Sequence, residues 1–194
     1  MGRVANKQRP EELRRAIVNY LLEHGLAELS LRPLAKAVGS SPRVLLYYFG
    51  SKERLVTNVL ADIRREQAAI LGEVQTATFA EACTLAWKRM SGPDWEPFFR
   101  LFFEAYGIAL RSPRRYKSFL QTTVEEWLEL ISRPLVASGY ASQDARAFAT
   151  VILGGLRGFM LDYSNTRDRK RVDRAVALWA RGLDGMLAEC QRRK

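Results

Sequence analysis

The sequence predicts an all-α protein in two parts, a compact three-helix part at the N-terminus followed by a larger helical part. Apolar residues recur at intervals of three or four along most of the chain, and no segment alternates apolar and polar residues with a period of two. Clusters of glycine, proline and serine divide these periodic stretches into lengths typical of helices. The chain has 194 residues, of which 47% are hydrophobic, so it can bury a substantial core.

The first helix is expected over residues 10–24. Leu13, Ile17 and Leu21 recur at helical spacing and would share one face, and Gly25 follows as a helix-ending residue. This helix would brace the two short helices that come next.

The next segment reads as a short helix, a tight turn and a second short helix. Ser30 is expected to cap the first of them with its side chain, and Leu34 and Val38 would form the buried edge of that helix. Gly39 then breaks the helix. Two helices joined by such a turn are typical of a helix-turn-helix, whose second helix enters a DNA groove.

The second short helix is expected over about residues 42–48. Ser41 is a good capping residue, and Pro42 suits the first helical position. Leu45 and Phe49 should point inward. That phase leaves four side chains pointing outward, namely Arg43, Val44, Tyr47 and Tyr48.

A family resemblance rests on residues spread in order through this segment: Ser30-Leu31-Arg32, Leu34-Ala35, Gly39-Ser40-Ser41, Leu45, Tyr47-Tyr48-Phe49 and Ser51-Lys52-Glu53. This run resembles the DNA-binding domain of the tetracycline-repressor (TetR) family and covers about the first quarter of the chain. Two positions depart from the family pattern: Arg43 stands where glycine is common, and Leu46 stands where tyrosine is common. The resemblance implies a dimeric transcriptional regulator, most often a repressor.

The DNA-binding residues expected from this segment are Pro42 and two further groups. Ser30, Arg32, Ser41, Tyr48 and Lys52 would hold phosphates. The helix that starts at Pro42 would bring Arg43, Val44 and Tyr47 to base edges, and the guanidinium of an arginine can pair with guanine O6 and N7.

Charge and cysteine usage agree with a polyanionic partner. The chain has a formal net charge of +10, and residues 1–66 hold 12 Lys and Arg against 7 Asp and Glu. A basic N-terminal arm, with Arg3, Lys7 and Arg9, would be either a solvated tail or a further DNA contact. Cys83 and Cys190 form no metal or redox pattern, so neither a metal nor another cofactor is expected. No secretory signal or membrane span is visible, which predicts a cytoplasmic protein.

A fourth helix, over about residues 51–72, would link the three-helix part to the larger helical part. The domains are accordingly expected at 1–56, for DNA binding, and at 57–194, for effector binding and dimerisation. The second domain should be all-helical, with helices at about 78–90, 95–110, 113–137, 142–164 and 168–190.

Aromatic residues are dense in this second domain. For any single one an ordinary core position is the simpler explanation, but six between Trp95 and Tyr106 fall on more than one side of their helix, which favours a cavity. The resemblance implies an effector site here, for a small hydrophobic or aromatic molecule. Its expected lining is Trp87, Phe99, Phe102, Phe103, Tyr106, Phe119, Trp127 and Tyr163, with Arg100, Glu104, Tyr106 and Tyr163 as polar hooks.

The last two helices carry small residues and an apolar stripe. These fit either packing within one chain or a homodimer in which the two helices and their symmetry mates form a four-helix bundle, as the resemblance also implies. A two-fold dimer predicts a palindromic operator. The expected interface residues are Gly154, Gly158, Val172, Val176, Trp179, Leu183 and Met186.

Enzymatic function is not indicated. His24 is the sole histidine and stands beside a helix-ending glycine, and no phosphate-binding glycine loop, HExxH motif or nucleophile elbow is present. Two alternatives to a regulator remain: a small-molecule-binding module whose helix-turn-helix is a relic, and an all-α enzyme without a recognisable catalytic group.

Overall fold

In the computed structural model, residues 8–72 and 78–192 are described, and they form helices only. The predicted arm with Arg3 and Lys7 lies outside the described residues, as does the side chain of Arg9. The helices are α1 (Gln8–His24), α2 (Leu31–Ala37), α3 (Pro42–Phe49), α4 (Lys52–Gly72), α5 (Phe79–Met90), α6 (Glu96–Arg111), α7 (Lys117–Ala137), α8 (Ser142–Thr166) and α9 (Arg169–Arg192).

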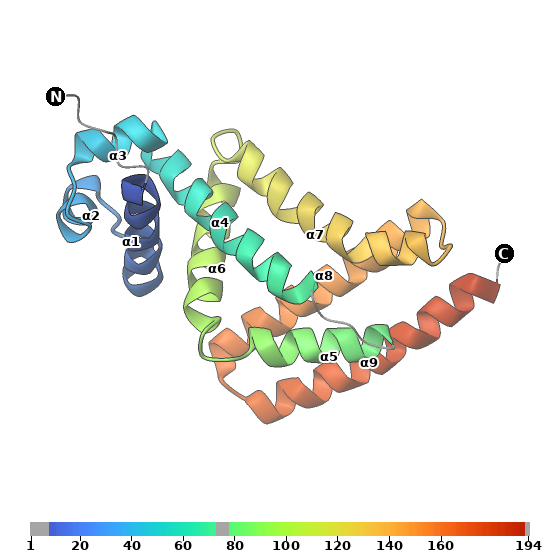
Figure 1. The fold of residues 1–194 in the computed structure, drawn as a ribbon. Coiled ribbons are helices and arrows are strands. Elements are labelled where there is room, and N and C mark those ends of the chain that lie inside the picture. Colours follow the sequence, from blue (N-terminus) through green and yellow to red (C-terminus); the bar gives the residue numbers. More distant parts are fainter. Residues whose placement is uncertain (1–7, 73–77, 193–194) are drawn as a thin grey trace.

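Helices α1–α3 form a compact unit, here called the head, at one end of the molecule (Figure 1). Its core contains Ile17, Leu21, Leu34 and Leu45, all with no exposed surface. Gly39 lies between α2 and α3 with φ +64°, a backbone conformation that side chains with a Cβ disfavour. The predicted helix-turn-helix is therefore confirmed, together with its glycine turn.

Helix α4 leads from the head into the remaining helices, α5–α9, here called the body (Figure 1). Leu55 and Val59 near its start are fully buried, and Ile63 is 7% exposed. One continuous cluster of buried apolar side chains extends from the head along α4 into the body. The head is thus held by packing as well as by the chain.

The body consists of two antiparallel pairs that cross: α7 packs along α8, and α5 packs along α9 (Figure 1). Helix α6 stands between the head and this arrangement and contacts α1, α4, α7 and α8. None of the described helices is both long enough and apolar enough to span a membrane.

The expected helix bounds agree with the structure to within a few residues, with the largest difference at the start of α7. The sequence predicted that this helix begins at residue 113, but it begins at Lys117. The N–H groups of Arg115 and Tyr116 both donate to the carbonyl of Ser112, which makes the intervening residues a turn. The all-α fold is confirmed.

Candidate nucleic-acid interface and apolar cavity

Helix α3 presents one buried and one open face. The Val44 N–H donates to Ser41 Oγ at 3.3 Å, so Ser41 caps the helix as predicted, and Pro42 occupies its first turn. Leu45 and Phe49 are buried, as the spacing predicted. These two anchors fix the rotation of the helix about its axis.

The outward residues of α3 are exposed as the sequence predicted. Arg43 is exposed, and the exposed fractions are 39% for Val44, 83% for Tyr47 and 49% for Tyr48. The two tyrosine rings meet edge to face, with centroids 5.4 Å apart. Leu46, which the predicted site left out, is also 42% exposed, so an apolar side chain lies beside the tyrosines. This face can offer a guanidinium, two phenol groups and apolar contacts to a groove.

The predicted phosphate-binding residues outside α3 have different surroundings. Ser30 stands at the N-cap of α2, but its side chain makes no capping bond, so the expected side-chain cap is wrong there. Arg32 is exposed. The Lys52 ammonium donates to the Leu29 carbonyl, which ties the start of α4 to the loop before α2. An ammonium has three donors, so two remain for an anion.

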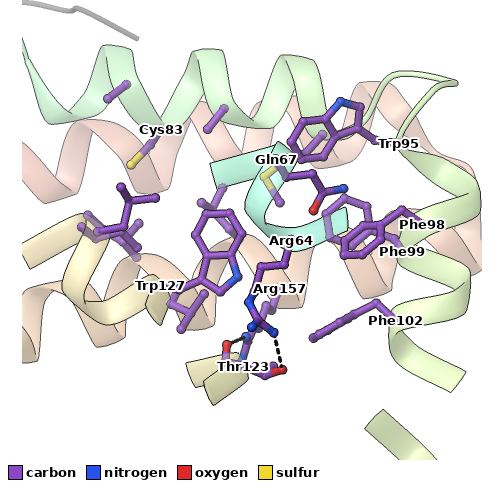
Figure 2. A pocket seen from close by; sticks show the side chains of 18 of the residues that line it. Arg64, Gln67, Cys83, Trp95, Phe98, Phe99, Phe102, Thr123, Trp127 and Arg157 are labelled. Carbon is purple, nitrogen blue, oxygen red and sulfur yellow. Dashed lines mark hydrogen bonds between the residues drawn. The ribbon is translucent and has the colours of Figure 1, made fainter. Parts of the chain in front are cut away.

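An apolar cavity of about 270 Å³ lies among α4, α5, α6, α7 and α8 (Figure 2). Four of the predicted residues line it, namely Phe99, Phe102, Phe119 and Trp127. Trp95, Phe98 and Cys83 line it as well. Burial raises the pKa of the Cys83 thiol to about 12, and the charge of Asp184 acts in the same direction. This thiol therefore stays protonated at neutral pH.

Four residues that were predicted to line the effector site do not line this cavity, namely Trp87, Phe103, Tyr106 and Tyr163. The Trp87 indole N–H donates to Asp173 Oδ1 at 2.6 Å, and its ring packs against Tyr163 at 5.8 Å between centroids, so both rings belong to the core beside α9. Phe103 and Tyr106 lie on the same side of α6 as Phe99 but behind the lining: Phe103 packs on Phe99, with ring centroids 6.2 Å apart, and Tyr106 packs on Phe102 at 5.5 Å. The aromatics of α6 recur at intervals of three and four and so form one stripe along the helix, which is longer than the cavity, so some of them pack on their neighbours instead of on the cavity.

The cavity also has a polar part that the sequence analysis missed. Arg64 Nε donates to Glu126 Oε2 at 2.8 Å, and Arg64 Nη1 donates to Thr123 Oγ1 at 3.2 Å. Arg157 Nη2 donates to the Thr123 carbonyl at 2.6 Å (Figure 2). Gln67 lines the cavity too, on α4 one turn after Arg64. The available signal was the spacing of Arg64 and Gln67 from the buried Leu60, which puts two polar residues on the buried face of α4.

Arg100 and Glu104, which were predicted as polar contacts for the effector, bind to the head instead of lining the cavity. Arg100 Nη2 donates to the Leu22 carbonyl at 2.8 Å, and Glu104 Oε2 accepts from the Leu26 N–H at 2.8 Å. Gly25 has φ +72°, and a Cβ there would lie 2.9 Å from Glu104 Oε2. Helix α6 is therefore bonded to the end of α1 and the loop that follows it.

A second cavity, of about 240 Å³, lies between the head and the body. Lys52, Glu53 and Arg115 line it, and Arg115 forms an ion pair with Glu53. Burial raises the pKa of Glu53, but its own backbone N–H, the Ser51 hydroxyl and the charges of Arg115 and Lys52 together hold the pKa below its ordinary value. Leu60 and Phe119 line both cavities and thus separate them.

The predicted dimer residues fall on two different faces. Val172, Val176 and Leu183 have 0–1% exposed surface because α9 packs along α5 within one chain, so their assignment to an interface is wrong. Trp179 packs over Gly155, where a Cβ would meet its ring at 2.5 Å. The open face consists of Val151, Gly154, Gly158 and Leu161 on α8 and Leu178 and Met186 on α9.

Comparison with known proteins agrees with this geometry. Residues 13–59, from α1 to the middle of α4, match the family model described as bacterial regulatory proteins, tetR family. The chain carries a TetR-family DNA-binding domain. It is therefore a DNA-binding transcriptional regulator and not an enzyme. No curated protein sequence matches the chain.

Solved structures share the fold over nearly the whole chain. A transcriptional regulator from Rhodococcus sp. Rha1 is 20% identical, with a TM-score of 0.73 over 93% of this chain and 96% of that one. Salmonella enterica GusR is 16% identical, with a TM-score of 0.69 over 93% and 98% of the two chains. The fatty acid degradation regulator FadR from Bacillus halodurans is 16% identical, with a TM-score of 0.58 over 92% and 95%. All three identities are below 25%, so the likeness establishes the fold alone.

Proposed function

We propose that the protein is a ligand-responsive repressor that binds a palindromic operator as a homodimer and is released by a small hydrophobic or aromatic effector. The observation that carries the proposal is the combination of an exposed face on α3, with an arginine and two tyrosines, and an apolar cavity in the same chain, with α4 and α6 contacting both the head and the cavity. A repressor acts where chromosomal DNA lies, which places it in the cytoplasm.

In the proposed complex α3 enters a major groove. Arg43, Val44 and Tyr47 contact base edges, while Tyr48 and Ser41 contact phosphates on either side of the groove. Ser30, Arg32, the remaining donors of Lys52 and the ring of Pro42 complete the contact set, with Pro42 in van der Waals contact only because it has no backbone N–H. The exposure of the α3 side chains supports this orientation.

The homodimer is proposed to form through the open face of α8 and α9. Exposed fractions there reach 55% for Leu161, 67% for Leu178 and 51% for Met186. A Cβ added at Gly154 or Gly158 would meet nothing within 4 Å, so a second helix can approach closely at those positions. Apolar patches of this kind mark interaction surfaces, and a two-fold axis would pair α8 and α9 with their copies.

Two physical links join the cavity to the head. Helix α6 carries Phe98 and Phe102 into the cavity, and on its other side Arg100 and Glu104 bond to the backbone at the end of α1. An effector that displaces the aromatic side chains would shift α6 and the head together.

The second link is the wall between the two cavities. A ligand that presses on Leu60 or Phe119 would push these side chains into the space beneath the head, where Glu53 and Arg115 are paired.

We propose that the boundary between the DNA-binding domain, 1–56, and the effector and dimer domain, 57–194, lies within α4, because this helix belongs to both.

Release requires that the effector bind more tightly to the conformation that cannot bind DNA. By linkage, the operator then weakens effector binding by the same factor. An effector of equal affinity for both conformations would leave DNA binding unchanged.

Footprinting of DNA that flanks the gene, with and without small apolar compounds that raise the melting temperature of the protein, tests the proposal. We expect protection of an inverted repeat and its loss when a stabilising compound is added. Protection that no stabilising compound alters would refute ligand release, and uniform weak protection of all sequences would refute operator recognition.

A further inference from the structure

The polar groups of the larger cavity form a small set on an otherwise apolar surface. The side chains of Arg64, Gln67, Thr123 and Arg157 come from α4, α7 and α8, helices that are far apart in sequence. Figure 2 shows Arg157 beside Thr123 and the Gln67 amide among Trp95, Phe98 and Phe99. The remaining lining is aliphatic or aromatic except for the Cys83 thiol.

The charges in this set do not balance. Arg64 is paired with Glu126, whose carboxylate reaches it from the surface. Arg157 is different, because no described carboxylate forms an ion pair with it. The lining contains two arginines and, among its described residues, no acidic side chain. One positive charge therefore stands uncompensated beside an apolar space, which is costly unless an anion joins it.

The surroundings of Arg157 favour the binding of an anion. Burial lowers the pKa of Arg157 from its ordinary value, and the nearby charge of Arg64 acts in the same direction, while Tyr106 partly offsets them. Its guanidinium carbon lies 5.3 Å from the Phe102 ring centroid and 5.8 Å from that of Tyr106. These ring faces, the Thr123 carbonyl and a hydrogen bond to the Tyr106 side chain hold the group in place, while a guanidinium has five N–H donors in total. Donors thus remain for a ligand.

Gln67 supplies an independent observation. The residue is 6% exposed, and its Oε1 atom is buried without a hydrogen-bond partner in the described part of the chain. Buried polar atoms are nearly always paired in folded proteins. A hydrogen-bond donor that enters the cavity would satisfy this oxygen.

We infer that the cavity binds an amphipathic monocarboxylic acid, with its carboxylate on Arg157 and its aliphatic or aromatic body among Phe98, Phe102 and Trp127. A hydroxyl or amide N–H on the body of the ligand would pair with Gln67 Oε1. This inference rests on the proposed function only in treating the bound acid as the effector.

Charge and size select this ligand class over its neighbours. A monoanion compensates the single unbalanced charge, whereas a phosphate dianion would leave an excess negative charge in an apolar space. A cation would be repelled by both arginines. The cavity of about 270 Å³ admits a small organic acid, and its apolar walls favour a ligand with a hydrocarbon chain or ring.

The test compares probes that differ only in head group. Decanoate, decanamide and decylamine, and separately 4-phenylbutyrate and its amide, are titrated into the full-length protein below their micellar concentrations. Fluorescence reports binding, because Trp95 and Trp127 line the cavity. We expect at least one acid to bind at least about tenfold more tightly than its amide, since charge-assisted hydrogen bonds are roughly twice as strong as neutral ones. Equal affinity of acid and amide, or no binding of either acid, would overturn the inference.

Substitutions then locate the carboxylate. Arg157→Gln should weaken the acid by at least about tenfold and leave the amide nearly unchanged. The matched control is Arg146→Gln, since Arg146 lies on the same helix but is exposed and paired with Glu125. Circular dichroism verifies folding, and the comparison of acid with amide on the unaltered protein does not depend on any variant. If Arg157→Gln weakens acid and amide alike, Arg157 is not the anion site.

The outcome can be separated from that of the proposed function. Binding of an acid that requires Arg157 but leaves the operator complex intact would support the ligand class and refute effector action. Release of the operator by a neutral compound that fills the same cavity, with no acid bound, would support ligand response and refute this inference.

Discussion

Arg43 is the residue on which sequence recognition depends most in this account. It lies in the first turn of α3, beside the capping Ser41 and one turn before Tyr47, and it is exposed. An arginine at this position can reach past the phosphates to the edge of a base pair, where paired hydrogen bonds to guanine discriminate between sequences.

Replacing Arg43 with alanine should reduce discrimination between operator and random DNA by about 1 to 3 kcal/mol, the range of one good bidentate contact. Fluorescence anisotropy on operator and scrambled duplexes measures both affinities. Arg146→Ala, which removes an exposed arginine on α8, serves as control and should change neither. Equal losses on the two duplexes would show that Arg43 contacts only phosphates.

Ser30 and Ser41, which precede α2 and α3, show that a serine at an N-cap position does not always form a capping hydrogen bond. Both occupy an N-cap with extended backbone, but only Ser41 accepts a hydrogen bond from the helix. Sequence reasoning treated them alike because residue type and position predict a cap, whereas the side-chain rotamer depends on local packing.

Ser41→Ala should therefore lower the free energy of unfolding by about 1 kcal/mol, and Ser30→Ala by clearly less. Urea denaturation followed by circular dichroism compares the two variants with the unaltered protein. Equal destabilisation by both substitutions would mean that Ser30 also caps its helix in solution.

Helix α6 is the element that gives the molecule its connection between cavity and head. One side of it faces the cavity through Phe98 and Phe102, and another bonds to the head through Arg100 and Glu104. The sequence indicated that its aromatics face several directions, but assigned Arg100 and Glu104 to the cavity. Which neighbour covers each side of a helix depends on tertiary packing, which helical periodicity does not contain.

Glu104→Ala leaves the Leu26 N–H without its acceptor and should lower the free energy of unfolding by about 1 to 2 kcal/mol. It should also reduce the factor by which effector weakens operator binding, because one of the two α6 bonds to the head is lost. Operator titrations with and without effector measure that factor. Glu129→Ala is the control, since Glu129 is an exposed α7 residue paired with Arg133, and it should change neither quantity.

Periodicity does not tell which neighbour covers a helix face, and this also explains the wrong interface prediction on α9. The stripe that contains Val172, Val176 and Leu183 was predicted as an interface, and it is buried against the body of its own chain. A heptad-like stripe predicts that a helix face is covered but does not say by which chain. The exposed Leu178 and Met186 lie on another side of α9.

At the scale of the whole molecule, a single buried apolar cluster joins head and body, and two cavities share a wall within it. The all-α fold, the helix order and the exposed face of α3 could be predicted because they depend on local spacing and turn residues. The polar part of the larger cavity could not, since Arg64, Thr123 and Arg157 meet only after three distant helices pack. Only the spacing of Arg64 and Gln67 on α4 carried a signal.

Selection of binding sites from a pool of random-sequence duplexes tests the central claim most directly, because it needs neither effector nor gene context. The account predicts an enriched inverted repeat whose half-site centres lie about 34 to 36 Å apart or more, one site for each α3 of a symmetric dimer. When the selection is repeated with the Arg43→Ala variant, the enriched half-site should lose its sequence preference at one base pair. A pool that stays random after repeated selection, while the protein still binds duplex DNA, would contradict the claim.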